Sequence, residues 1–71
     1  MSIKKTLNEV KVILANNQIT FIESTIANAT GTRLDLQGSY AGVIINCYSS
    51  GKVTVQGSNS QLIPAVESLL K

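Results

Sequence analysis

This chain of 71 residues contains no histidine, so the side chain that most often serves as a general base in enzymes is missing. Its carboxylates are scattered over separate expected elements, with no paired or metal-ligand spacing among Glu9, Glu23, Asp35 and Glu67. The glycines match neither a phosphate-binding loop nor a dinucleotide fingerprint. We therefore expect no catalytic activity, no cofactor and no bound metal.

The only cysteine, Cys47, has no partner for an internal disulfide. The alternation of its segment places it on the core side of a strand, where a free thiol acts as a small apolar residue. The sequence also lacks an apolar run long enough to cross a bilayer, and its start lacks a signal-peptide pattern. We expect a cytoplasmic protein that does not bind membranes.

Charged residues make up only 14% of the chain, and six basic against four acidic side chains give a net charge of +2. A dedicated DNA clamp usually carries a denser basic stripe, so this charge permits nucleic-acid binding without requiring it. So few charges also fit a protein that covers part of its surface with a partner. The length allows a single domain, residues 1–71, with a small stability margin.

Residues 33–57 are the stretch around which the rest of the chain is organised. They have the pattern of three short strands, joined by turns near Gly38 and Gly51, and only glycine adopts the left-handed end of the second turn cheaply. Strand side chains alternate between two faces. One alternating set is apolar and is expected in the core: Leu34, Leu36, Ala41, Val43, Ile45, Cys47, Val53 and Val55. The other set is mixed, which predicts a sheet covered on one face and open on the other.

Before this stretch, residues 1–5 are expected to form a loose lead-in. The segment Thr6–Glu9 has the form of a capping box, and apolar residues at helical spacing behind it predict a helix from Leu7 to Asn16. Residues 19–26 are rich in β-branched and aromatic side chains, which predicts a strand whose phase the pattern leaves open. Residues 28–32 are expected to form the loop that follows.

After the central stretch, a second helix is expected at the C-terminus. Ser58 or Ser60 would cap it, and Pro64 places its first regular turn nearby, because proline clashes deeper inside a helix. The expected element order is α-β-β-β-β-α. We therefore expect an α+β fold in which two helices pack on one face of a four-stranded antiparallel sheet.

The hairpin of residues 48–57, with the sequence Y-S-S-G-K-V-T-V-Q-G, resembles a feature of the N-terminal domain of bacterial ribonuclease HIII. In that family an apolar strand ends in a tyrosine, a Ser-Gly-Lys turn follows, and the next strand ends in Gln-Gly before a helix. The resemblance covers residues 5–71 in outline and residues 48–57 in detail.

This resemblance implies a fold like one half of the TATA-box-binding protein, with a curved antiparallel sheet and helices on its convex side. It also implies a non-catalytic role, holding an RNA/DNA hybrid for a separate nuclease domain. That nuclease domain and its acidic metal-binding residues have no counterpart in this chain, so we expect a stand-alone module. Similar sheet domains also occur in toxin–antitoxin endoribonuclease systems, which leaves a protein-binding role open.

The open face of the expected sheet supplies the candidate binding residues. Aromatic rings stack on bases, Arg and Lys meet phosphates, and Asn or Gln bond base edges. The candidates are Arg33, Tyr40, Ile44, Asn46, Tyr48, Lys52, Thr54 and Gln56. Lys4 and Lys5 would add phosphate contacts. In the alternative interpretation the tyrosines are ordinary cross-strand partners and Lys52 is simply solvated.

Two functional hypotheses follow from these residues. The first is a small non-catalytic module that binds RNA, a single strand or an RNA/DNA hybrid on the open face. The second is a protein-interaction module, either a homodimer or an antitoxin-like inhibitor that binds a toxin or effector protein. Ile44 among polar neighbours and the need of a short chain for extra burial motivate the second. A domain detached from a longer enzyme is a third, weaker hypothesis.

Overall fold

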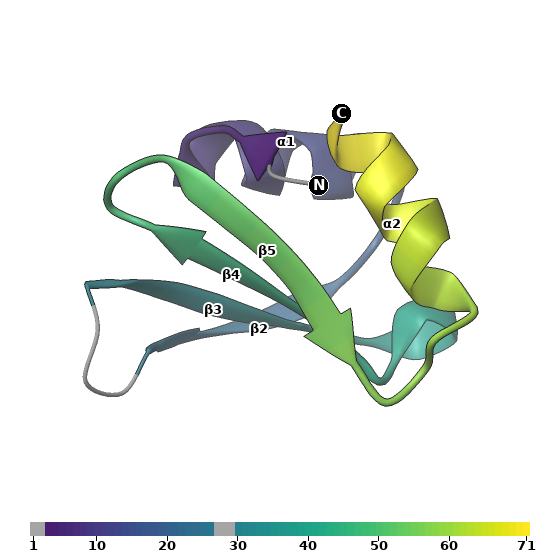
Figure 1. Cartoon of the computed structure of the whole chain (residues 1–71). Helices are drawn as coiled ribbons and strands as arrows, with labels where there is room; N and C mark the ends of the chain where they lie inside the picture. The colour runs from purple at the N-terminus through teal and green to yellow at the C-terminus, as the bar shows by residue number, and fades with distance from the viewer. Residues whose placement is uncertain (1–2, 27–29) are drawn as a thin grey trace.

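A computed structural model describes residues 3–26 and 30–71, which form an α+β fold (Figure 1). In chain order the elements are β1 (Ile3–Lys4), α1 (Leu7–Asn16), β2 (Phe21–Thr25), β3 (Gly31–Leu36), the short 3-10 helix η1 (Gly38–Tyr40), β4 (Val43–Tyr48), β5 (Lys52–Gly57) and α2 (Leu62–Leu70). All strand pairs are antiparallel, and they form one sheet in the order β1-β5-β4-β3-β2. The predicted fold class is confirmed, but the described sheet has five strands rather than four.

The additional strand is β1, which lies in the segment that was expected to be a loose lead-in. Ile3 pairs with Val53, and Lys4 pairs with Lys52. Ile3 is buried in the core, and this burial holds the N-terminal segment against the edge of β5. A strand of two residues is too short to show an alternation of its own, which is why the pattern did not predict it.

Helix α1 begins and ends where the sequence predicts. The Thr6 hydroxyl accepts a hydrogen bond from the Glu9 amide at 3.2 Å, and the Thr6 amide donates to Glu9 Oε1 at 2.9 Å, so the capping box is confirmed. Hydrogen bonding to Thr6, above all to its backbone amide, lowers the pKa of the Glu9 carboxyl. Behind the box, Val10 and Leu14 are fully buried.

Helix α2 begins without a serine cap. Its N-cap residue is Gln61, whose side chain makes no capping hydrogen bond, so the predicted cap at Ser58 or Ser60 is wrong. The backbone is already helical at Gln61 (φ −73°, ψ −31°), whereas a capping side chain acts from an extended residue. Pro64 lies in the first turn, as predicted, where its missing N–H has no helical partner to lose. Neither helix in the described ranges has the length and apolarity needed to cross a membrane.

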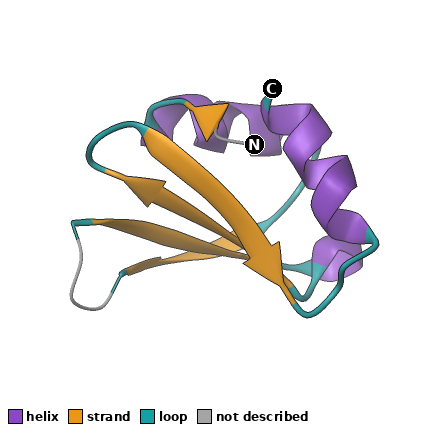
Figure 2. Ribbon diagram, in the orientation of Figure 1, coloured by secondary structure: helices purple, strands orange, loops and turns teal. Residues whose placement is uncertain are grey.

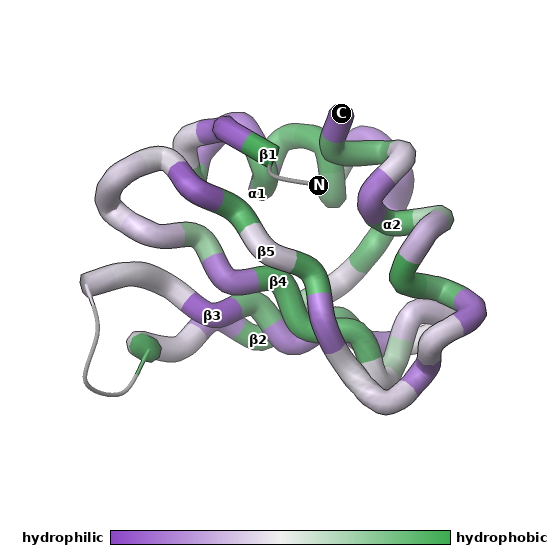
Figure 3. The backbone as a smooth tube through the Cα atoms, viewed as in Figure 1, coloured by the Kyte–Doolittle hydropathy of each residue, from purple (hydrophilic) through white to green (hydrophobic). Residues whose placement is uncertain are grey.

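Both helices cover the same face of the sheet (Figures 1 and 2). Hydrophilic and hydrophobic residues alternate along β5 in Figure 3, so only alternate side chains face the helices. One buried cluster unites the sheet and the helices: Ile3, Val10, Leu14, Ile19, Leu34, Leu36, Val43, Ile45, Cys47, Val53, Val66 and Leu70. Val55 is half-buried against this cluster. The predicted core side of the central strands is therefore confirmed, with one exception.

The exception is the segment that leads into β4. Ala41, predicted to be in the core, is exposed between η1 and the start of the strand. Tyr40, predicted to lie on the open face, belongs to η1 and packs against the core. Both predictions are wrong for the same reason: they extend the alternation of β4 backward through a turn, and a turn breaks the two-residue period.

Strand β2 is shorter than the predicted segment, and the structure fixes its phase. Ile19 is buried before the strand begins, and Phe21 packs against the core. Ile22 points to the opposite face and is 59% exposed. Glu23 lies on the face of Phe21, where its carboxylate pairs with Lys11 at 2.6 Å. This strand is at the edge of the sheet, which is why its two faces are less clearly sorted than those of its neighbours.

The loop predicted at residues 28–32 is wrong at its C-terminal end. Gly31 and Thr32 already belong to β3, where Thr32 pairs with Thr25. Residues 27–29 lie outside the described residues. The β4–β5 turn is confirmed, because Gly51 has the expected left-handed conformation with φ +94°.

Gly57 allows a close approach of β5 to the start of β4. Its φ is +147°, and a Cβ at this position would overlap the backbone carbonyl oxygen of Gly42, whereas a Cβ at Gly51 would meet only open space.

We expect Gly51→Ala to lower the free energy of unfolding by about 1 kcal/mol through backbone strain alone. Gly57→Ala should cost about 1–3 kcal/mol more, because the strands must separate locally. Urea unfolding measures both, and equal losses would contradict a constraint at Gly57.

Candidate functional site

The face that the helices leave open carries three rows of cross-strand neighbours. Strand register defines the rows, because directly opposed residues point to the same face of a sheet. The isoleucine row consists of Ile22, Asp35, Ile44 and Gln56. The polar row consists of Ser24, Arg33, Asn46 and Thr54. The lysine row consists of Gly31, Tyr48, Lys52 and Lys4.

The lysine row joins two cations and an aromatic ring. Lys4 and Lys52 are directly opposed on β1 and β5, and both side chains are exposed. Like charges at opposed positions of a sheet are destabilising, so an anion bound between them would relieve a repulsion. Tyr48 and Lys52 are the two residues that close the β4–β5 hairpin, which brings the phenol ring to the same end of the face.

The net charge of the whole chain lies on this open face. The ionisable side chains in the three rows are Lys4, Arg33, Lys52 and Asp35, which are three cations against one carboxylate. The other three lysines and the three glutamates lie on the helices, on the helix-covered face of β2, in the β1–α1 connection or at the C-terminal residue. Those six charges cancel. The excess of +2 is therefore concentrated on the face that has no helices.

Arg33 forms an ion pair with Asp35 on this face. Its Nε donates to both carboxylate oxygens of Asp35 at 3.2 Å, and its Nη2 donates to Oδ1 at 3.0 Å. The two residues are two apart on β3 and so share a face. An ion pair this exposed contributes at most about 1 kcal/mol, so a bound phosphate would be able to compete for the guanidinium.

Asn46, at the centre of the open face, is only 7% exposed and is the one buried polar side chain in the described ranges. It lies between Arg33 on β3 and Thr54 on β5. Its register places it away from the helices, so neighbouring side chains on the open face account for its burial. A ligand on this face would meet Arg33 and Thr54 before the Asn46 amide.

Seven of the eight candidate residues are on the open face, namely Arg33, Ile44, Asn46, Tyr48, Lys52, Thr54 and Gln56. Tyr40 is not among them, because it packs against the core from η1. Lys4 joins the face through β1, whereas Lys5 lies in the connection between β1 and α1. Sequence reasoning missed Ile22, since its place beside Asp35 depends on the register of β2 and β3.

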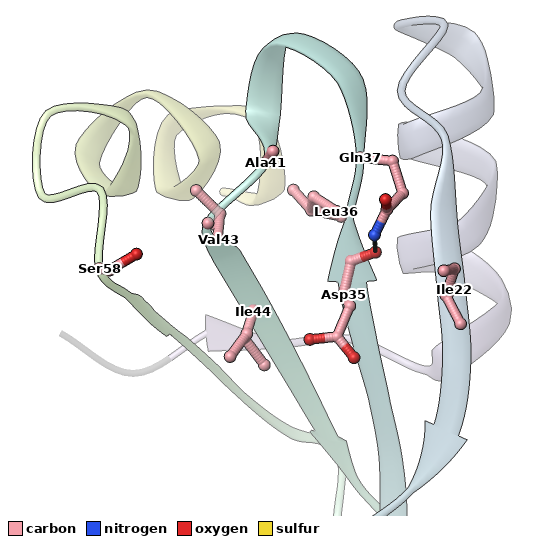
Figure 4. Close-up of a pocket in the computed structure, with 9 residues that line it drawn as sticks. Ile22, Asp35, Leu36, Gln37, Ala41, Val43, Ile44 and Ser58 are labelled. Atoms are coloured by element: carbon pink, nitrogen blue, oxygen red, sulfur yellow. Dashed lines mark hydrogen bonds between the residues drawn. The ribbon is translucent and has the colours of Figure 1, made fainter.

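One end of the open face is hollowed beside the isoleucine row (Figure 4). The cavity has a volume of about 480 Å³, and its lining includes Ile22, Asp35, Gln37, Ile44 and Ser58. Ile22 and Ile44 lie on either side of Asp35. The Gln37 side-chain amide donates to the backbone carbonyl of Asp35 at 3.1 Å, which leaves the amide oxygen of Gln37 as an acceptor.

Within residues 3–26 and 30–71, no three His, Cys, Asp or Glu side chains come together as a group that would hold a metal ion. Comparisons of the chain with protein-family models, curated proteins and solved structures found no match. The functional proposal therefore depends on the geometry and charge of the open face, together with the sequence resemblance of residues 48–57.

The buried thiol of Cys47 is expected to make the fold less stable as the pH rises into the alkaline range. Cys47 is 4% exposed, and burial raises the pKa of its thiol, with a smaller contribution from the Glu23 carboxylate. A thiol whose pKa is raised by folding stabilises the fold fully below the unfolded pKa of about 8.5, and this contribution is lost as pH rises through the folded pKa. We expect the free energy of unfolding to fall more steeply above about pH 8.5 in the unaltered chain than in Cys47→Ala. Urea titrations across this range measure the difference, and parallel pH profiles would contradict it.

Proposed function

We propose that this chain is a non-catalytic module that binds nucleic acid, either a single strand or an RNA/DNA hybrid, on the open face of its sheet. The concentration of the whole excess positive charge on that face carries the proposal. Phosphates supply most of the sequence-independent affinity of nucleic acids for proteins, and Lys and Arg are the side chains that neutralise them.

The three rows supply complementary contacts for such a ligand. Lys4 and Lys52 would bind phosphates, and Tyr48 beside them would stack on a base. The polar row would bind a phosphate through Arg33 and offer hydrogen bonds to base edges through Thr54. Successive rows are about 7 Å apart along the strands, because each step spans two residues at roughly 3.3 Å each. A strand of nucleic acid that follows β4 would thus meet each kind of contact in turn.

The sequence resemblance supports the same proposal. The N-terminal domain of ribonuclease HIII implies an antiparallel sheet with helices on one side, and an arrangement of that kind is present here. We propose on this basis that the fold is similar to one half of the TATA-box-binding protein. The matching hairpin contributes Tyr48, Lys52, Thr54 and Gln56 to the open face.

Phosphate contacts of the lysine row predict a specific salt dependence. Each phosphate contact on a single strand contributes a slope of about 0.7 to the fall of log K with log salt concentration. We expect the double variant Lys4→Gln, Lys52→Gln to bind a labelled single strand more weakly, with a slope reduced by about 1.4. Fluorescence anisotropy at several salt concentrations measures the slope.

The matched control is Lys71→Gln, which removes the same kind of charge from an exposed residue outside the sheet. It should leave the slope nearly unchanged. A slope change in Lys71→Gln as large as that in the double variant would place the contacts elsewhere. An unaltered chain that binds neither single strands nor hybrid at low salt would overturn the proposed function.

The free edge of β2 favours a second candidate function, self-association. The Thr20 carbonyl accepts from the Gln37 amide at 2.8 Å, and the Ile26 amide donates to the Gly31 carbonyl at 3.3 Å, so even-numbered residues bond to β3. The backbone groups of alternate residues therefore face the free edge, namely those of Phe21, Glu23 and Thr25. Such an edge is a template for pairing with another chain. A second copy paired there in antiparallel register would continue the sheet and its open face.

Glu23 decides whether this edge is protected. A charged residue on the inner face of an edge strand opposes pairing, but the ion pair with Lys11 partly neutralises this carboxylate. We expect the unaltered chain and Glu23→Ala to dimerise as concentration rises. Glu23→Pro should stay monomeric, because proline removes an outward-facing N–H without taking a hydrogen bond from the β2–β3 pairing.

Sedimentation velocity over a concentration series measures the oligomeric state, and circular dichroism checks that Glu23→Pro remains folded. An unaltered chain that stays monomeric throughout the series would overturn self-association through β2. A heterologous partner such as a toxin or effector protein would use the same edge, and would then be detected as a complex that Glu23→Pro weakens.

A further inference from the structure

We propose that the cavity beside the isoleucine row is a nucleobase pocket, which prefers bases with an exocyclic amino group over thymine or uracil. This inference depends on the proposed function, because it names the part of a bound strand that the far end of the open face recognises. It assigns a base-reading role to Asp35, Gln37, Ile22 and Ile44, of which only Ile44 is a candidate from the sequence.

The cavity lies on the path that a nucleic-acid strand bound at the lysine row would follow along β4. Ile44 and Tyr48 are the second and last residues of β4, and both side chains face the open side of the sheet. Four residues of a strand span about 13 Å, so the cavity and the tyrosine ring are two rows apart on one continuous surface. A strand with one base on Tyr48 and its phosphates at Lys52 would extend along β4 toward the cavity.

The walls of the cavity suit the flat faces of a base. Ile22 is one of only two large apolar side chains in the described part of the chain that are strongly exposed, and it shares its row with the half-buried Ile44. Figure 4 shows these two side chains on opposite sides of Asp35. Base pockets commonly hold the ring between apolar or aromatic side chains while polar groups read its edge.

The polar groups at the cavity accept hydrogen bonds more than they donate them. The Asp35 carboxylate accepts from Arg33 and retains further lone pairs, and Gln37 uses one of its two side-chain N–H groups on the Asp35 carbonyl, which leaves its oxygen and one N–H. The carboxylate can only accept, so a ligand group bound to Asp35 must donate. The N4 amino group of cytosine and the N6 amino group of adenine donate, whereas thymine presents the O4 acceptor at the corresponding position.

Charge also determines which part of a bound nucleic acid enters the cavity. Asp35 is the only carboxylate in the three rows, and it lies in the row farthest from Lys4 and Lys52. A phosphate would be repelled at this end and attracted at the other. The open face therefore has a phosphate-binding end and a base-reading end.

Fluorescence anisotropy with labelled oligodeoxycytidine and oligothymidine of equal length tests this pocket. We expect the unaltered chain to bind the cytidine strand about fivefold more tightly or better, since a good base-edge contact discriminates by at least that factor. Asp35→Asn, which adds a donor and frees Arg33, should bring the ratio close to one while the affinity for thymidine rises. Glu67→Gln, which removes the same charge from α2 on the opposite side of the sheet, should keep the ratio.

The experiment distinguishes a failure of the nucleobase pocket from a failure of the proposed function. Equal affinity of the unaltered chain for the two oligonucleotides would overturn the nucleobase pocket alone. A preference that Asp35→Asn leaves unchanged would also overturn it. Absence of binding to both oligonucleotides would overturn the pocket and the proposed function together.

Ile22→Ala, at an exposed position whose truncation does not threaten folding, should weaken binding of the cytidine strand if the isoleucine walls hold the base.

Discussion

The burial of one face of the sheet under both helices is the constraint on which the rest of the structure depends. Leu34 and Ile45 are directly opposed on β3 and β4 and fully buried, and Val10 of α1 and Val66 of α2 complete the same cluster. Full burial of each such side chain is worth about 1.5–3 kcal/mol. A shift of the strand pairing by one residue would expose these apolar side chains to water. The packing therefore fixes the strand register, and the register determines which residues lie on the open face.

The open face is therefore determined by the core even though no helix contacts it. Ile3, buried under the helices, holds β1 against β5, and this pairing places Lys4 opposite Lys52. The pairing of like charges is unfavourable by itself and persists because apolar packing on the other side compensates it. Unfavourable local arrangements, such as two opposed lysines, tend to occur at functional sites. This is why the lysine row supports the proposed function.

Ile22 connects the proposals made for this surface. It is a wall of the cavity at the isoleucine row, and it also belongs to β2, which is an edge strand of the sheet in the described part of the chain. A second copy paired at that edge would bring new side chains next to the cavity, so base recognition and self-association would influence each other. The lysine row, at the far end of β4, would be less affected.

The sequence by itself determined what depends on neighbours a few residues away: the capping box and span of α1, the glycine turn at Gly51, and the alternation within the central strands. It also identified most of the open face, because alternation alone separates the two sides of a strand. Only the tertiary structure decided the position of Tyr40 against the core, the pairing of Ile3 with β5, and the grouping of Ile22 with Asp35. These depend on turns that break the period and on pairing between distant segments, which no short-range pattern encodes.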